Sequence, residues 1–518
     1  MRSMTTEFRR RFATWQKLWQ ARFAPAAGLS AALLLAACAT PADPYSVAPA
    51  ATQIARNDAV GDCLRRLKAL DARIDAAGRR DAQAARVPGY PYLRVDRFTA
   101  GWSAGDTEAA ELSGGKVEQM AALDAEARRF EAANAGIAAD ELRAVERCRA
   151  TLAAEARQSG AAAVEAAQVP DSYSDTQRLL GLYPLTAIPF SWGVASWQQL
   201  TRDTFATPFP ELPVQGERIR YVPTPAAVGP VAGLIGTSTA QALRMPVLSP
   251  AQAWQLLNRH APVLIVDTAD GDDRVGALTW RASTDGAVLA VNTKDPVAYV
   301  RIAWTEINGV ALPQLVYTFW FPARPQEYTF ALVAGHLDAL VWRVTLDAEG
   351  RPLVYDSIHA DGGFHMFFPT ERVRERPGPP KHEGPIDESM FSPQVVHSPG
   401  RAERVMVFLG AHDHNIVRVG IDSPTPAPGV KYRLLDEDVL RALPVPAVAG
   451  GGTRSAYGPD GLVPGSERAE RYVYWPMGIP SAGQMRQWGH HATAFVGRRH
   501  FDDPRLMDRY FTLAPGAE

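Results

Sequence analysis

Hydrophobic positions recur at helical spacing in the first part of the chain. Apolar side chains three and four residues apart form a stripe at Val60, Cys63, Leu67, Leu70 and Ile74. A second helical block runs from about Ser113 to Gln158, with a break near residues 134–136, and includes Cys148 in its apolar face. Such spacing is typical of amphipathic helices. We therefore predict a helical hairpin over residues 58–168.

Strand patterns dominate after residue 169. Runs of β-branched and aromatic residues bounded by Asp, Gly and Pro predict strands at 262–267, 287–293, 299–307, 314–322, 328–333, 340–347, 352–358, 405–411 and 415–419. Residues 340–347 alternate most clearly, and the turn at Gly350 makes them a hairpin with 352–358. The predicted fold is α+β, in which the helical hairpin precedes a mainly antiparallel β domain that is sandwich or barrel-like. A few short helices are also expected, at 250–260 and 482–491.

One long apolar run allows two interpretations. Residues 179–197 contain only apolar, small or hydroxyl side chains, but Pro184 and Pro189 interrupt them. We favour a buried connection in the core. Membrane contact near an N-terminal anchor is the alternative.

The first forty residues have the pattern of an export signal. Basic residues precede an apolar run from Ala26 to Ala37, which is too short to span a bilayer. The Ala- and Pro-rich stretch that follows indicates a flexible spacer. The expected organisation is a signal peptide at 1–37, a spacer at 38–57, the helical region at 58–168 and the β domain at 169–518. A division of the β domain near 370–400 stays open.

Leu35-Ala36-Ala37-Cys38 closes the apolar run and resembles the lipobox of bacterial lipoproteins. The resemblance implies cleavage before Cys38, acylation of its thiol and attachment to a membrane through the lipid. Ala39 stands where an inner-membrane-retained relative would carry Asp, which points to the outer membrane, with the body facing the periplasm. Two or three acyl chains would hold the protein essentially permanently, since each buried methylene contributes about 0.8 kcal/mol.

Cys63 and Cys148 are the cysteines that remain once Cys38 is assigned to the lipid. In an oxidising compartment a disulfide between them is the economical interpretation. Two buried thiols that never meet are the alternative. Net charge is −2 with 21% charged residues, so the totals give no sign of a nucleic-acid partner.

All 11 histidines lie at or after His260, so a histidine-based site must be built in the β region. The candidate metal ligands are His336, Asp338, His359, His365, His412 and His414. Residues two apart on an extended chain share a face, so His412 and His414 could hold one ion. Imidazoles and a carboxylate would suit Zn²⁺. Ordinary strand-end histidines with one hydrogen bond each are the competing interpretation.

Two further patterns contain residue types that could form a site. Ser357 lies between Asp356 and His359, but neighbours on one strand point to opposite faces and cannot form a catalytic triad. Near the C-terminus, arginine and tryptophan could bind a carboxylate or a sugar at Arg471, Trp475, Arg486 and Trp488. Arg and Trp stacking in an ordinary core explains the same residues.

Four blocks of the body resemble a family of uncharacterised proteobacterial exported proteins: residues 335–338, 342–347, 355–359 and 498–504. The resemblance brings no activity with it. Some relatives carry Cys-x-Cys between the histidines that are His359 and His365 here, where this chain has Asp361 and Gly363. That difference argues against a thiolate-containing metal site.

The sequence supports two hypotheses. The first is an outer-membrane lipoprotein that binds or scaffolds envelope components, with an envelope protein or glycan as partner. The second is a metal-dependent hydrolase that uses the histidines of the β domain. Convergence of three or more of those residues at one cleft would favour the enzyme.

Overall fold

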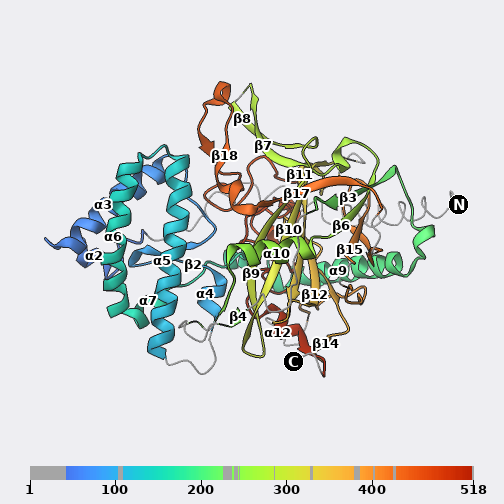
Figure 1. Ribbon diagram of the computed structural model, residues 1–518, viewed down its shortest axis with the longest axis horizontal. Coiled ribbons are helices and arrows are strands. Elements are labelled where there is room, and N and C mark those ends of the chain that lie inside the picture. Colours follow the sequence, from blue (N-terminus) through green and yellow to red (C-terminus); the bar gives the residue numbers. More distant parts are fainter. Residues whose placement is uncertain are drawn as a thin grey trace.

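The computed structural model describes residues 43–102, 109–225, 236–237, 243, 245–284, 286–326, 331–378, 386–400, 403–423 and 427–515. Helices gather at one end, on the left of Figure 1, and a large sheet forms the other end. The protein is therefore mixed α+β, as expected. Among the described residues, no helix is both long and apolar enough to cross a bilayer.

In the helical end, several helices and a two-stranded sheet pack around one apolar core. Its elements are α2 (Ala50–Gln53), α3 (Ala59–Ala76), β1 (Ala85–Val87), β2 (Tyr90–Val95), α5 (Ala109–Asn134), α6 (Ala139–Gln158) and α7 (Gly160–Ala166), with α4 (Arg97–Gly101) after β2. β2 is buried along its whole length.

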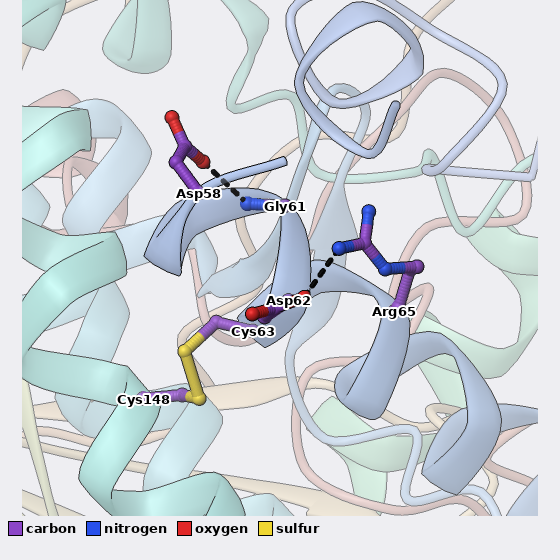
Figure 2. The surroundings of a disulfide bond; sticks show 6 residues. All are labelled: Asp58, Gly61, Asp62, Cys63, Arg65 and Cys148. Carbon is purple, nitrogen blue, oxygen red and sulfur yellow. Dashed lines mark hydrogen bonds and ion pairs between the residues drawn. A yellow bond between two sulfur atoms is a disulfide. The ribbon is translucent and has the colours of Figure 1, made fainter. Parts of the chain in front are cut away.

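The predicted disulfide is present, and it joins α3 to α6 (Figure 2). The two Cα atoms lie 5.4 Å apart, because Cys63 and Cys148 each occupy the apolar stripe of their own helix. Asp58 fixes the start of α3, where its side chain accepts a hydrogen bond from the backbone N–H of Gly61. This is the N-cap contact that short polar residues favour.

Residues 43–57 are folded, so the prediction of a flexible spacer is wrong for this part. The Tyr45 hydroxyl donates a hydrogen bond of 2.7 Å to Asp71 on α3, and the Tyr45 side chain is buried. Ala50 on α2 is also buried. The apolar side chains that composition alone suggested as linker therefore belong to the core of the helical end.

Ten strands form one large mixed sheet in the order β13-β12-β11-β10-β9-β17-β3-β6-β15-β16. The strands are β3 (Glu217–Pro223), β6 (Val263–Thr268), β9 (Val297–Ile307), β10 (Val310–Arg324), β11 (Gly335–Leu346), β12 (Pro352–His359), β13 (Met366–Pro369), β15 (Val405–Leu409), β16 (Ile416–Ile421) and β17 (Val430–Asp436). Most pairs are antiparallel, but β6 with β15, β17 with β3 and β17 with β9 are parallel.

The sheet carries a core on each face. Leu340, Trp342 and Val344 of β11 point into a core shared with β6, β15 and β16. Val341 and Ala339, which alternate with them, point into a second core. Because strands far apart in the sheet order share the first core, the sheet curls around it. Strands on both sides of residues 370–400 belong to this one sheet.

The remaining elements are short hairpins and helices around the sheet. They are α8 (Asp175–Leu180), α9 (Tyr183–Ala206), η2 (Phe209–Glu211), β4 (Gly236–Thr237), β5 (Pro246–Val247), α10 (Pro250–His260), η3 (Gly271–Asp273), β7 (Ala277–Ser283), β8 (Gly286–Asn292), β14 (Val373–Glu375), η4 (Glu437–Ala442), β18 (Leu443–Pro444), η5 (Ala447–Ala449), β19 (Thr453–Arg454), α11 (Arg471–Tyr474), η6 (Trp475–Met477), α12 (Leu506–Tyr510) and β20 (Phe511–Leu513). The prediction of α10 is confirmed, and Ser249 caps it with a capping box.

Three local predictions fail. Residues 482–491 form turns and not a helix. Residues 331–333 are not a strand, and residues 327–330 lie outside the described part of the chain. The run 179–197 is helical but is not a buried connection, because Leu179, Leu185 and Trp192 are 77%, 67% and 67% exposed. Because side chains point in all directions around a helix, a helix that packs on one side leaves the apolar side chains of its other side exposed.

Candidate functional site

Asp338 is the centre of a buried polar cluster at one end of the first core. It precedes Leu340 on β11 by two residues, so its side chain points to the same face of the sheet. His359 pairs directly with Leu340 from the end of β12 and shares that face. Both side chains are almost completely buried. The alternation that builds the core therefore also brings these two polar residues together.

Four side chains surround the carboxylate of Asp338. Arg468 Nη2 lies 3.0 Å from Oδ1, and His359 Nδ1 lies 3.5 Å from the same oxygen. His414 Nδ1 lies 2.8 Å from Oδ2, and Arg324 Nε lies 3.6 Å from it. Asp338, Arg324, His359, His414 and Arg468 are referred to below as the Asp338 network.

The charges of this network shift its titration. Burial alone would raise the pKa of Asp338, but Arg324, Arg468 and His359 hold that pKa well below its usual range. Burial would likewise lower the pKa of His414, yet the carboxylates of Asp273 and Asp338 raise it. Two guanidinium groups next to Asp338 oppose binding of a cation at this carboxylate.

Backbone strain is concentrated around the same residues. Leu337, Phe364, His412 and His414 all have positive φ, between 51° and 67°. Such conformations cost non-glycine residues about 1–3 kcal/mol each and tend to persist at functional sites. Phe364 packs edge-on against His359, with ring centroids 5.1 Å apart. The strained residues therefore belong to the Asp338 network or lie next to it.

His414 connects the network to two surface loops. Its ring stacks on Phe321 at 3.9 Å and is fully buried. Its Nε2 atom lies 3.3 Å from Oδ1 of Asp273, a residue of the loop after β6. His414 itself lies in the loop after β15, which runs parallel to β6. The carboxyl ends of these two strands thus bring the loops together.

One group of described residues has the spacing of a metal site. Asp270, Asp273 and His412 each offer a ligand atom, and these atoms all lie within 4.8 Å of one another. His412 Nε2 is 3.7 Å from Asp270 Oδ2, and the backbone N–H of His412 donates to Asp273 Oδ1 at 2.5 Å. Asp270 is exposed, whereas Asp273 is buried. Of the predicted ligands, only His412 belongs to this group.

Two other predicted ligands, His336 and His365, contact residues outside this group. His336 Nε2 lies 2.7 Å from the carbonyl oxygen of Leu289. His365 Nε2 lies 3.1 Å from Asp356 Oδ2, and Asp356 also pairs with Arg343 at 2.5 Å. Arg343 alternates with Trp342 and so lies on the opposite face of the sheet from Asp338. Burial lowers the pKa of His365 to about 3. The six candidates therefore do not surround one ion.

The predicted ligand-binding residues also lie in two different places. Arg486 and Trp488 line a cavity beside Trp320 and His491, with room for about one water molecule. The guanidinium of Arg486 donates to the carbonyl oxygens of Asp361, Pro480 and Ser481, which fixes loops. Arg471 and Trp475 lie on α11 and η6, and neither lines this cavity. Arg471 donates to the Tyr472 hydroxyl at 2.7 Å.

Sequence reasoning missed several residues of the site. Arg324 and Arg468 have no local signal, because only the tertiary fold brings them to Asp338. Asp270 and Asp273 did carry a signal, since they lie in the acidic turn directly after the strand at 263–268. Asp361 was also missed, although its Oδ2 lies 3.5 Å from Arg468 Nη1.

Comparisons with protein-family models, curated proteins and solved structures gave no match for this chain.

Proposed function

We propose that this protein is a lipoprotein of the outer membrane whose body binds or scaffolds other envelope components. The observation that carries the proposal is the disulfide between Cys63 and Cys148. Disulfides persist in oxidising compartments such as the periplasm and are rare in the cytosol. This supports export, which the resemblance of residues 35–38 to a lipobox also implies.

The folded body would lie close to the lipid. If Cys38 is acylated, only six residues separate it from Tyr45, whose buried side chain is bonded to Asp71 of α3. Six extended residues span at most about 22 Å. A partner must therefore reach the body near the membrane surface, and an envelope protein or a glycan layer at that surface fits this position.

The exposed apolar side chains of α8 and α9 fit contact with the lipid surface itself. Leu179, Leu185 and Trp192 are exposed, and the chain has no charged residue between Arg178 and Arg202. Water-exposed apolar area of this kind marks interaction surfaces. The bilayer to which the acyl chains would attach is an extended apolar phase, and we assign the surface to it.

The helical end is proposed to act as a brace. Its disulfide joins α3 to α6, and Arg441 of the β region forms ion pairs with Asp81 and Glu126 of the helical end. The Arg441 side chain is buried. These contacts would hold the two ends of the molecule together as one support.

Membrane fractionation of cells that express the full chain tests the anchor. We expect the protein in the outer-membrane fraction and labelling by exogenous palmitate. Cys38→Ala should abolish labelling and shift a large part of the protein out of the membrane fraction. Equal labelling and the same fraction for both forms would contradict the anchor.

Flotation with phospholipid vesicles tests the apolar surface separately, in the Cys38→Ala background that lacks the lipid. Leu185→Gln with Trp192→Gln should reduce vesicle binding. Val448→Gln is the matched control, since Val448 is an 88% exposed apolar residue elsewhere. Unchanged flotation of the double variant would contradict lipid contact and leave the acyl anchor unaffected.

The second candidate function is a metal-dependent hydrolase. It is favoured by the four positive-φ residues that frame Asp338 and His359. His359 presents Nδ1 to Asp338, so its Nε2 lies on the other side of the ring, in the arrangement of a histidine base held by a carboxylate. Zinc-dependent cleavage of chromogenic esters or phosphates, lost in His359→Ala, would support this function. No cleavage under these conditions would favour binding alone.

A further inference from the structure

The loops after β6 and β15 contain a set of donors that the sequence alone did not assemble. Asp270 and Asp273 come from the first loop, and His412 and His414 come from the second. Three of the four already have ligand atoms within 4.8 Å of one another. We infer that Asp270, Asp273, His412 and His414 form a binding site for one divalent transition-metal ion, best suited to Zn²⁺.

The spacing of His414 and Asp273 fits ligands of one ion better than it fits a hydrogen bond. His414 Nε2 lies 3.3 Å from Asp273 Oδ1, but this buried nitrogen has no partner in hydrogen-bond geometry. Ligand atoms about 2.0–2.1 Å from a tetrahedral zinc ion lie about 3.3 Å apart. A buried ring nitrogen normally has a partner, and an ion between these two atoms would supply it.

The second ring nitrogen of His414 is held as in known zinc sites. Its Nδ1 faces Asp338 at 2.8 Å, and Phe321 stacks on the ring. Ligating histidines usually present their other nitrogen to a carboxylate, which orients the ring and makes it a better ligand. Arg324 and Arg468 balance the charge of Asp338. Asp338 is therefore the support of the site and not a ligand.

The charge of the four ligands and their access to solvent both favour Zn²⁺. Two carboxylates and two neutral imidazoles neutralise a divalent cation, and this mixture of nitrogen and oxygen donors suits zinc. The side chains of Asp270 and His412 are 51% and 22% exposed, so an ion can enter from solvent. Their 3.7 Å separation requires only a small rotation of exposed side chains.

The test is a zinc titration of the tag-free full chain in detergent, after removal of metal with chelator. We expect one zinc ion per chain, and an absorption spectrum of the cobalt-substituted protein that is typical of tetrahedral coordination. Asp270→Asn and His412→Ala should each weaken zinc binding by about tenfold or more. Loss of a residue that merely orients a ligand already lowers metal affinity by about 10–100-fold. His397→Ala is the matched control, because that side chain is 93% exposed and its nearest charged partner is Glu371 at 4.0 Å.

Two results would overturn the site. One is a full chain that takes up no zinc at tens of micromolar. The other is equal affinity in the wild type, Asp270→Asn and His412→Ala, which would assign any bound zinc to other residues. The unfolding midpoint of each metal-free variant checks its fold, and Asp270→Asn is expected to match the wild type since its side chain is half exposed.

Discussion

Each end of the molecule contains a buried ion network. The helical network consists of Asp71, Arg86, Arg94, Asp124, Arg128 and Glu131. The Asp338 network has the same guanidinium and carboxylate groups but adds two histidines. No member of the helical network has positive φ, whereas His414 does, as does Leu337 next to Asp338. The two networks therefore contain similar buried charges, but only the Asp338 network includes or adjoins residues with positive φ.

The difference lies in where each network ends. In the helical network Arg94 contacts Glu131 at 2.7 Å, Arg128 contacts Asp71 at 2.6 Å, and the charges are paired within the core. In the Asp338 network, His414 continues outward to Asp273 and the surface loops. In the helical network, the paired arginines and carboxylates hold the packed elements of the core together. A histidine placed between a buried carboxylate and a surface carboxylate can connect the core to a ligand.

The largest effect is expected from Asp338→Asn. It leaves Arg324 and Arg468 buried without their shared counter-charge, which should lower the free energy of unfolding by about 3–5 kcal/mol. Glu131→Gln should cost a similar amount in the helical network. Urea denaturation of the metal-free proteins measures both. A wild-type midpoint for Asp338→Asn would contradict the central position of this carboxylate.

Zinc binding separates these two variants. Asp338→Asn should weaken zinc binding by about 10–100-fold, because Asp338 orients His414. Glu131→Gln should leave zinc affinity unchanged at temperatures where both variants are folded. Equal zinc affinity in the two variants would contradict the claim that only the Asp338 network supports a metal site.

Loss of the disulfide comes next in size. Replacing both Cys63 and Cys148 by Ala should lower the free energy of unfolding by about 2–5 kcal/mol, because the bond closes a long loop in the unfolded chain. The separation of 85 residues places the expectation in the upper half of that range. Reduction of the wild type should reproduce the effect, and an unchanged midpoint in both experiments would contradict it.

Acid should weaken the helical network through Asp71. Burial alone would raise the pKa of Asp71, but Arg128 and Arg86 lower it to about 2 from the usual 3.8. A lowered folded pKa stabilises the protein above pH 4, and this stabilisation is lost as the pH falls toward 2. About 2 kcal/mol is expected to disappear over this interval. Asp71→Asn should flatten that part of the pH profile, while the exposed Asp62→Asn should not.

The smallest effect is expected at Tyr45. Tyr45→Phe removes the hydrogen bond to Asp71 and should cost about 1 kcal/mol. Ser46→Ala, a neighbour that bonds only to the local backbone, serves as the control. Equal stability of Tyr45→Phe and wild type would argue that residues 43–57 add little to the core.

Periodicity predicted much of this fold, since local patterns decide helices and strands. The stripe of α3, the limits of α10 and the hairpin of β11 and β12 follow directly from it. The ten-strand order could not be predicted, because parallel pairs such as β6 with β15 join segments about 140 residues apart. The packing of residues 43–57 could not be predicted, because alanine and proline composition does not reveal burial.

The candidate site was predicted only in part. Sequence spacing selected His412, His414, Asp338 and His359 as candidates. The fold places His359 and His414 beside Asp338, and the hairpin explained why Asp338 and His359 meet. Sequence spacing also added His336 and His365, which the fold directs elsewhere. Spacing along the chain gives the face of a strand, but it does not give the neighbours that long-range topology supplies, such as Arg468 and Asp273.

Thermal unfolding of the full chain with and without zinc tests the connection between core and surface most directly. At a zinc concentration about 100 times the dissociation constant, the ion should stabilise the wild type by about 2.7 kcal/mol and raise its unfolding temperature. Asp270→Asn should show the same unfolding temperature as wild type without zinc and a much smaller rise with it. An equal rise in both proteins, or no rise in the wild type, would contradict the proposed site.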